Sequence, residues 1–121
     1  MLRNDLFSIE QLDYRDNVLR VAISLEAEHP VFKGHFPGNP VTPGVVQIQI
    51  VKELLELHLK KKLYLDSIGR CKFLHVLNPA ENAKLEVVIT IKNAENSLDV
   101  NASGLNPEAT FFKFNASYRY Q

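Results

Sequence analysis

The chain has 121 residues, 45% of them hydrophobic and 23% charged, and its 14 basic residues balance 14 acidic ones. Such a balance gives no general electrostatic attraction for nucleic acid or for an anionic membrane surface, and the composition is that of a folded domain. The length predicts a single domain over residues 1–121. The start turns polar too early for a signal peptide, and no apolar run has membrane-spanning length. We therefore expect a cytoplasmic protein that binds no nucleic acid and inserts into no membrane.

Two strands are predicted first. Hydrophobic and polar residues alternate at the start of the segment 18–32, where Val18, Val21 and Ile23 are separated by polar positions. This is the period of a half-buried strand. The preceding "FSIEQLDYRDN" is expected to pair with it, because Asp13 to Asn17 supply turn chemistry between the two.

A long helix is predicted from Val45 to about Lys62, in the sequence "VVQIQIVKELLELHLKKK". It contains no glycine or proline and is rich in leucine, and a proline and Gly44 precede it. Gln47 and Gln49 interrupt its aliphatic first two turns, and at helical spacing they point to nearly opposite sides. If the helix is central, at least one of these amides is buried and needs hydrogen-bond partners.

Four more strands are predicted after the helix, over residues 68–79, 83–95, 97–105 and 109–120. Each has β-branched or aromatic residues at alternate positions, and "NAEN" and "GLNPEA" supply turns between the later ones. One early helix followed by a meander of strands predicts an α+β domain, in which an antiparallel sheet wraps around the helix.

Metal and thiol chemistry are not indicated by the sequence. His29, His58 and His75 each stand alone without the spacing of metal ligands, so we expect no metal site and no cofactor. Cys71 is the single cysteine, which excludes an internal disulfide. We expect it to be a small buried hydrophobic residue, the commoner alternative to a reactive thiol.

The segment "GHFPGNPVTPGV", residues 34–45, resembles the active-site segment of the hotdog-fold 3-hydroxyacyl-acyl carrier protein dehydratases. That family reads G-H-F-P-x-x-P-V-x-P-G-V before an aliphatic residue and a helix, and every defined position matches in order. "CKFLHVLNP" and the closing strands agree more loosely. The resemblance implies a hotdog fold with one long central helix, a dimer with two sites at the subunit interface, and removal of water from a 3-hydroxyacyl thioester.

The resemblance also implies a catalytic pair. One member is the motif histidine, here His35, and the other is an acidic residue fourteen positions later on the helix of the partner subunit. This chain has Gln49 at that position. An imidazole titrates near neutral pH and suits proton transfer, whereas an amide orients a hydroxyl or a water but has no proton to give. Phe36 and Pro37, next to the histidine, are the expected substrate contacts.

The start of the predicted helix supplies a second part of the site. The first backbone N–H groups of a helix have no intrahelical partner, so those of Gly44 and Val45 suit the negative charge that develops on a thioester oxygen. Glycine also lets a substrate approach the backbone closely. These two residues are therefore expected to bind substrate.

Three hypotheses remain open for the replaced acid. In the first, the chain is still a hydro-lyase: His35 moves the protons and Gln49 only positions the hydroxyl. In the second, the acid has moved to Glu53, where the family usually has glutamine, although a solvated or salt-bridged helix residue is the simpler reading. In the third, the site binds an acyl thioester without turnover, or is the weaker half of a heterodimer.

An acyl thioesterase is a further alternative within the same fold. Thioesterases of this fold usually carry an acidic residue near the start of the helix, and none lies between Gly44 and Lys52. The expected partners are an acyl carrier protein or a coenzyme A thioester as substrate and a second copy of the chain, with a higher oligomer or a heterodimer as alternatives. Lys60 to Lys62, Arg70 and Lys72 are candidates for docking an acidic carrier protein, with a solvated helix end as the alternative.

Overall fold

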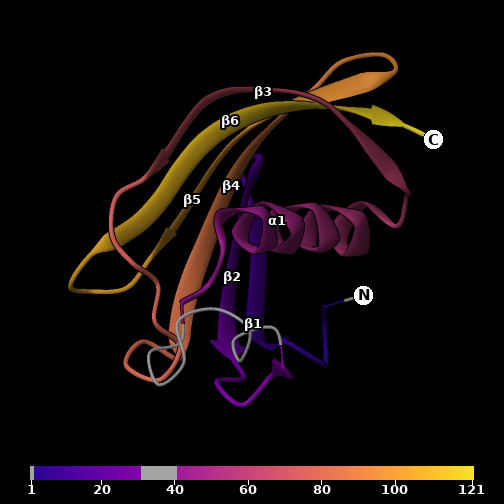
Figure 1. Cartoon of the computed structure of the whole chain (residues 1–121). Coiled ribbons are helices and arrows are strands. Elements are labelled where there is room, and N and C mark those ends of the chain that lie inside the picture. The colour runs from indigo at the N-terminus through magenta and orange to yellow at the C-terminus, as the bar shows by residue number, and fades with distance from the viewer. Residues whose placement is uncertain (1, 31–40) are drawn as a thin grey trace.

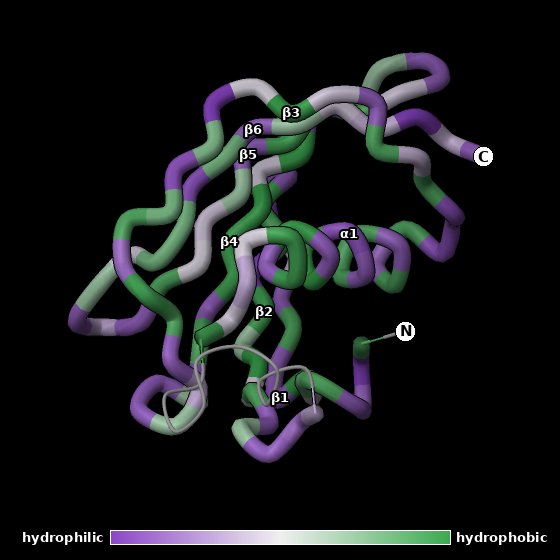
Figure 2. Tube along the Cα trace, viewed as in Figure 1, coloured by the Kyte–Doolittle hydropathy of each residue, from purple (hydrophilic) through white to green (hydrophobic). Residues whose placement is uncertain are grey.

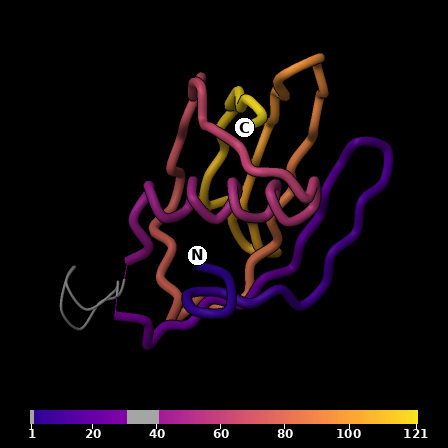
Figure 3. The backbone as a smooth tube through the Cα atoms, turned by 90° about the vertical axis from the view of Figure 1, so that its right-hand side faces the viewer, coloured from indigo at the N-terminus to yellow at the C-terminus, as the bar shows by residue number. Residues whose placement is uncertain are grey.

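The computed structural model of the protein describes residues 2–30 and 41–121. Within these ranges one helix lies against a six-stranded sheet whose neighbouring strands are all antiparallel, in the order β1-β2-β4-β5-β6-β3. The elements are β1 (Phe7–Arg15), β2 (Val18–Leu25), α1 (Gly44–Leu59), β3 (Leu63–Phe73), β4 (Lys84–Asn93), β5 (Ser97–Leu105) and β6 (Thr110–Tyr120). The sheet curves around the helix, which lies on its concave side (Figures 1 and 3). The predicted α+β arrangement is confirmed.

The first two strands form the predicted hairpin. Arg15 is in register with Val18, and the two residues between them, Asp16 and Asn17, have φ values of 52° and 64°. Positive φ at both positions is the geometry of the tight turns that match strand twist, and Asn and Asp tolerate it better than other non-glycine residues.

The helix buries a stripe at the spacing of an amphipathic helix. Its buried residues are Gln47, Ile50, Val51, Glu53, Leu54 and Leu55. The predicted end near Lys62 is wrong, because Lys60 adopts a left-handed conformation with φ 57° and the helix stops at Leu59. The chain then turns directly into β3, whose first backbone N–H, that of Leu63, donates to Glu56 Oε2 at 2.9 Å.

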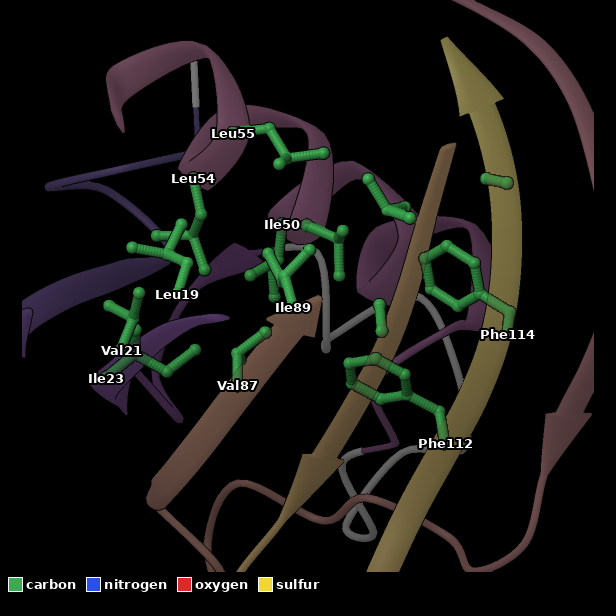
Figure 4. Close-up of a cluster of buried hydrophobic side chains, with 14 of the residues drawn as sticks. Leu19, Val21, Ile23, Ile50, Leu54, Leu55, Val87, Ile89, Phe112 and Phe114 are labelled. Atoms are coloured by element: carbon green, nitrogen blue, oxygen red, sulfur yellow. The ribbon is translucent and has the colours of Figure 1, made fainter. Parts of the chain in front are cut away.

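The core lies between the helix and the concave face of the sheet. Figure 4 shows its labelled members converging from four elements: Leu19, Val21 and Ile23 of β2, Val87 and Ile89 of β4, Phe112 and Phe114 of β6, and Ile50, Leu54 and Leu55 of α1. Hydrophobic and hydrophilic residues alternate along β4 and β5, as Figure 2 shows, so that each of these strands turns one set toward the helix. Burial of this apolar surface is what positions α1.

Three of the four predicted later strands are confirmed as β4, β5 and β6, and the remaining one was misplaced. It was expected over residues 68–79, but β3 spans Leu63–Phe73. β3 is an edge strand that buries only Leu63 and partly buries Ile68. Its pairing to β6 is irregular between Leu65 and Ser67 and again between Ile68 and Cys71. Without one buried face the strand shows no regular alternation, and its start is not visible in the sequence.

Candidate functional site

Backbone donors at the start of α1 have no partners among the described residues. Pro43 precedes the helix without a side-chain cap, and its carbonyl oxygen accepts from the N–H groups of Val46 and Gln47, each at 3.1 Å. Among the residues that the structure describes, none accepts from the N–H of Gly44 or Val45. The first turn also contains no acidic side chain. Within the described ranges the helix therefore presents the N–H groups of Gly44 and Val45 without acceptors at its positive end, and their role in binding substrate stays a prediction.

A groove of about 360 Å³ opens beside these donors. One wall is the segment 41–44 that leads into α1, with Gln47, and the other is residues 73–77, which follow β3. The walls are joined by a hydrogen bond from Thr42 N to the Leu77 carbonyl oxygen at 2.9 Å. Gly44 lies so close to the ring of Phe73 that a Cβ at this position would meet the ring Cζ at 2.7 Å. The glycine is needed for this approach.

Gln47 is the glutamine on the groove side. Its side chain is buried, and Nε2 donates to the Thr42 carbonyl oxygen at 3.0 Å. The amide oxygen of Gln47 and the hydroxyl of Thr42 are both buried without a hydrogen-bond partner in the described part of the chain. Two polar atoms beside the groove are thus left unsatisfied, which is uncommon in folded proteins.

Gln49 and Glu53 lie together on another side of the helix. Gln49 is half-buried, and its Nε2 donates to Glu53 Oε2 at 3.0 Å. Glu53 is buried, and its carboxylate also accepts from the backbone N–H groups of Leu2 and Arg3 at 2.8–3.1 Å. The prediction that at least one of the two glutamines is buried with a partner is confirmed. The simpler reading of Glu53 as a solvated residue is wrong, because the start of the chain covers it.

The other predicted site residues, His35, Phe36 and Pro37, lie outside the described residues, and their roles stay predictions. The sequence analysis missed Leu2, Arg3 and Phe73. The first two act through backbone N–H groups, which carry no residue-specific signal. Phe73 lies 29 positions after Gly44 in the sequence, and only the fold brings the two residues together.

His29, His58 and Cys71 do not line the groove at α1, whereas His75 lies in the wall formed by residues 73–77. His29 Nε2 lies 3.1 Å from Asp5 Oδ2, and the ring of His58 lies against that of Tyr14 with centroids 4.3 Å apart. In residues 2–30 and 41–121 no three His, Cys, Asp or Glu side chains come together as a metal ion requires. Cys71 is exposed on β3, so its predicted burial is wrong. An edge strand has few buried positions to offer it.

Known structures share this architecture. The dehydratase heterocomplex ApeI:P from Xenorhabdus doucetiae superposes with a TM-score of 0.73 at 21% identity, over 92% of this chain and 96% of that one. A thioesterase from Haemophilus influenzae gives 0.66 at 12% identity, over 97% and 80%. At such identities the likeness concerns the fold alone. One helix wrapped by an antiparallel sheet, shared with these proteins, defines the hotdog fold that the sequence predicts.

Sequence comparison identifies the family within that fold. The ApeI-like family model, described as ApeI dehydratase, matches residues 10–110, and the chain belongs to this family. The 3-hydroxyacyl-acyl-carrier-protein dehydratase FabZ of Lactococcus lactis is 30% identical over 95 residues, covering 69% of this chain and 63% of the relative. FabZ of a Thermoanaerobacter species is 34% identical over 73 residues, 54% and 51% respectively. The chain spans about half the length of several curated relatives that it matches.

A membrane-spanning helix is not found in the described ranges, since α1 is too short and too polar to cross a bilayer.

Proposed function

We propose that the chain is a hydro-lyase that converts a 3-hydroxyacyl thioester into the trans-2-enoyl thioester, in lipid synthesis of the fatty-acid kind. The observation that carries the proposal is the pair of N–H groups of Gly44 and Val45, which have no acceptor among the described residues and lie beside a groove. Donors fixed in this way stabilise the charge that gathers on the thioester oxygen as the neighbouring carbon loses its proton. Membership of the ApeI-like dehydratase family supports the same reaction.

The proton transfers are assigned to His35. Its neutral imidazole takes the proton from the carbon next to the carbonyl, the C–H electron pair becomes the new double bond, and the bond to the 3-hydroxyl breaks. The imidazolium then gives the proton to the departing hydroxyl, which leaves as water, so the histidine returns to its starting state. Gln49 of the partner subunit orients the hydroxyl in this scheme, and it can only orient it because an amide has no proton to give at neutral pH. Phe36 and Pro37 contact the substrate in this scheme.

The test is turnover of purified protein with a 3-hydroxyacyl thioester, and with the enoyl thioester for the reverse reaction. We expect absorbance to change with the enoyl group, and His35→Ala to lower kcat about 100-fold or more. Release of free thiol would instead identify a thioesterase, which the absence of an acid in the first turn of α1 disfavours. If neither reaction occurs and His35→Ala equals the parent, only the acyl-thioester-binding hypothesis survives.

The proposed substrate is carried by an acidic carrier protein rather than by coenzyme A. A groove of about 390 Å³ on the sheet is lined by Arg70, Lys72 and Lys113. Lys72 and Lys113 are directly opposite each other on β3 and β6, which is unfavourable for like charges. In the described ranges none of the three cations has an acidic partner within ion-pair distance. An acidic partner would relieve this repulsion. Phe73, the next residue after Lys72, already belongs to the groove at α1.

Charge reversal tests this docking surface. Lys72→Glu combined with Lys113→Glu is expected to raise KM about tenfold or more for a carrier-linked substrate at low salt, with little change for a short synthetic thioester. Lys92→Glu is the matched control, since Lys92 is exposed on β4 and does not line the groove. Equal effects on both substrates would exclude a role in carrier docking.

We also propose a homodimer formed through β3, at one edge of the sheet. Its exposed hydrophobic residues Tyr64, Leu65 and Phe73 continue past the strand into Leu74 and Val76, which line the groove at α1. An edge strand with unpaired backbone groups and apolar side chains is suited to pairing with a second copy. A second copy bound there would cover the groove and enclose the site.

Mass measurement in solution tests the dimer. Leu65→Asp on β3 is expected to give a monomer, whereas Leu12→Asp on the opposite edge leaves the dimer intact, although both leucines are 40% exposed. A parent protein that is already monomeric would remove the homodimer and leave a heterodimer as the alternative. A cytoplasmic location belongs to the same proposal, because the exposed, unpaired thiol of Cys71 suits a reducing compartment.

A further inference from the structure

The carboxylate of Glu53 is surrounded by donors. It is only 2% exposed. Oε1 accepts from Leu2 N at 2.8 Å and Arg3 N at 3.1 Å, while Oε2 accepts from Leu2 N at 2.9 Å and Gln49 Nε2 at 3.0 Å. A buried carboxylate persists in a folded protein when its oxygens are hydrogen-bonded in this way. These contacts suit the ionised form, because each one requires the oxygen to accept.

An acid catalyst needs the opposite arrangement. It must hold a proton on one oxygen and direct it at the substrate. At Glu53 both oxygens accept from N–H groups, and none of these contacts provides an acceptor for a carboxylic O–H. Burial also separates the group from anything bound at the surface. The displaced-acid hypothesis therefore lacks the contacts that it needs.

The same contacts fix the direction of the Gln49 amide. A carboxylate only accepts hydrogen bonds, so the end of Gln49 that faces Glu53 must be the NH₂ group. The amide oxygen is left as the free end, and no described residue donates to it. Gln49 is half-buried, so this oxygen is an acceptor with access to a ligand.

We propose that Glu53 is a positioning residue, which the backbone of Leu2 and Arg3 holds in place and which turns the amide oxygen of Gln49 toward the substrate bound in the groove of the partner subunit. The inference rests on the proposed dehydratase function and names the group that receives the 3-hydroxyl: its O–H donates to Gln49 Oε1. Gln49 then orients the departing oxygen but supplies no proton. Leu2 and Arg3 thereby help to hold the site in place, although they lie about fifty positions from Glu53 in the sequence.

A double-mutant cycle tests the proposal, using Glu53→Gln, Gln49→Ala and the double variant. We expect Glu53→Gln to lower kcat about tenfold in the parent and to have no further effect once Gln49 is alanine. If Glu53 acts only through Gln49, its replacement has no effect when Gln49 is absent. The pH profile of Glu53→Gln should keep the shape of the parent profile. A loss of 100-fold or more in both backgrounds, with a changed alkaline limb, would make Glu53 the acid and overturn the proposal.

Glu56→Gln is the matched control. Glu56 lies on the same helix and its Oε2 also accepts from a backbone N–H, that of Leu63 at 2.9 Å, but it does not contact Gln49. This variant is expected to keep the parent kcat. Thermal melts of all variants show whether each one folds, and Glu53→Asp serves as a second variant if Glu53→Gln does not.

A spectroscopic measurement separates this proposal from the dehydratase function itself. In ¹⁵N-labelled protein the side-chain NH₂ signals of Gln49 are assigned by their loss in Gln49→Ala. They are expected to shift in Glu53→Gln and to stay in place in Glu56→Gln. Signals that stay in place in both variants would refute the contact, whatever the protein catalyses. A parent protein without turnover whose signals shift would refute the reaction and keep the contact.

Discussion

Gln47 and Glu53 are two buried polar side chains on one helix, six positions apart, with very different surroundings. They are 3% and 2% exposed. The carboxylate of Glu53 accepts hydrogen bonds from Gln49 and from the distant backbone N–H groups of Leu2 and Arg3. Gln47 makes one hydrogen bond to the nearby Thr42 carbonyl, and its oxygen is unpartnered within the described ranges.

The difference shows which polar groups the fold itself requires. An unpaired buried charge is far more costly than an unpaired buried amide oxygen, so the fold must satisfy Glu53 and can leave Gln47 partly unsatisfied. Glu53, whose hydrogen bonds are satisfied, is covered by the first residues of the chain. Gln47, which is only partly satisfied, lines the groove at the start of α1. Of these two buried groups, the one with spare hydrogen-bonding capacity is therefore the one on the groove side of the helix.

Removing the saturated carboxylate should have the largest effect. Glu53→Ala leaves the N–H groups of Leu2 and Arg3 and the amide of Gln49 without their acceptor, and we expect it to lower the free energy of unfolding by about 3 kcal/mol. Denaturant unfolding measures this. Glu56→Ala, which removes one such contact, is expected to cost about 1 kcal/mol. Equal losses of unfolding free energy would show that Glu53 and Glu56 stabilise the fold to the same extent. The contrast between the fully satisfied Glu53 and the other polar groups would then fail.

Filling the space at the groove should have an intermediate effect. The added Cβ of Gly44→Ala meets the ring of Phe73 at 2.7–3.2 Å, so the ring must move. We expect a loss of about 1–2 kcal/mol, the range of overpacked sites. Phe73→Leu should relieve most of it, and unfolding of the two single variants and the double variant gives the coupling. Independent effects would mean that the ring does not control access to Gly44.

Replacing the partly satisfied amide should cost little. Gln47→Leu removes one hydrogen bond, to the Thr42 carbonyl, but it also removes an unpartnered buried oxygen, and we expect a net change within about 1 kcal/mol. Denaturant unfolding again measures it. A loss as large as that of Glu53→Ala would mean that the amide oxygen of Gln47 is satisfied in solution.

Much of the fold could be predicted from the sequence because its signals are local. The turn at Asp16 and Asn17, the helical stripe, and the alternation in β4 to β6 each depend on neighbouring residues. The bounds of β3 were predicted wrongly because an edge strand with little burial shows no alternation of hydrophobic and polar residues.

The candidate site was predictable only in part, for a related reason. The free donors of Gly44 and Val45 follow from helix geometry alone, and the opposite directions of Gln47 and Gln49 follow from helical spacing. The hydrogen bonds of Glu53 come from backbone N–H groups about fifty positions away in the sequence, and the contact of Gly44 with Phe73 depends on the path of β3. Long-range contacts of this kind leave no pattern around the residue concerned.

Tyr118 is a third buried polar side chain to set beside Gln47 and Glu53. Its replacement should give the smallest change in the free energy of unfolding. It is fully buried on β6, and its hydroxyl has no partner in the described ranges. Tyr118→Phe removes only this oxygen, so we expect the free energy of unfolding to rise by up to about 1 kcal/mol. Burial, with the charge of Glu56 adding to it, raises the pKa of Tyr118 well above its ordinary value of 10.0.

The pH dependence of stability provides the check on Tyr118. Above pH 10 the tyrosine of the unfolded chain loses its proton while that of the folded chain keeps it, so the folded state binds more protons and stability falls as pH rises. The contribution is present in full below pH 10 and is lost progressively above it. Tyr118→Phe lacks this contribution, and its unfolding free energy should decline less than that of the parent between pH 10 and pH 11. Parallel curves would mean that the hydroxyl has a partner or reaches water in solution, and would place Tyr118 with the satisfied groups.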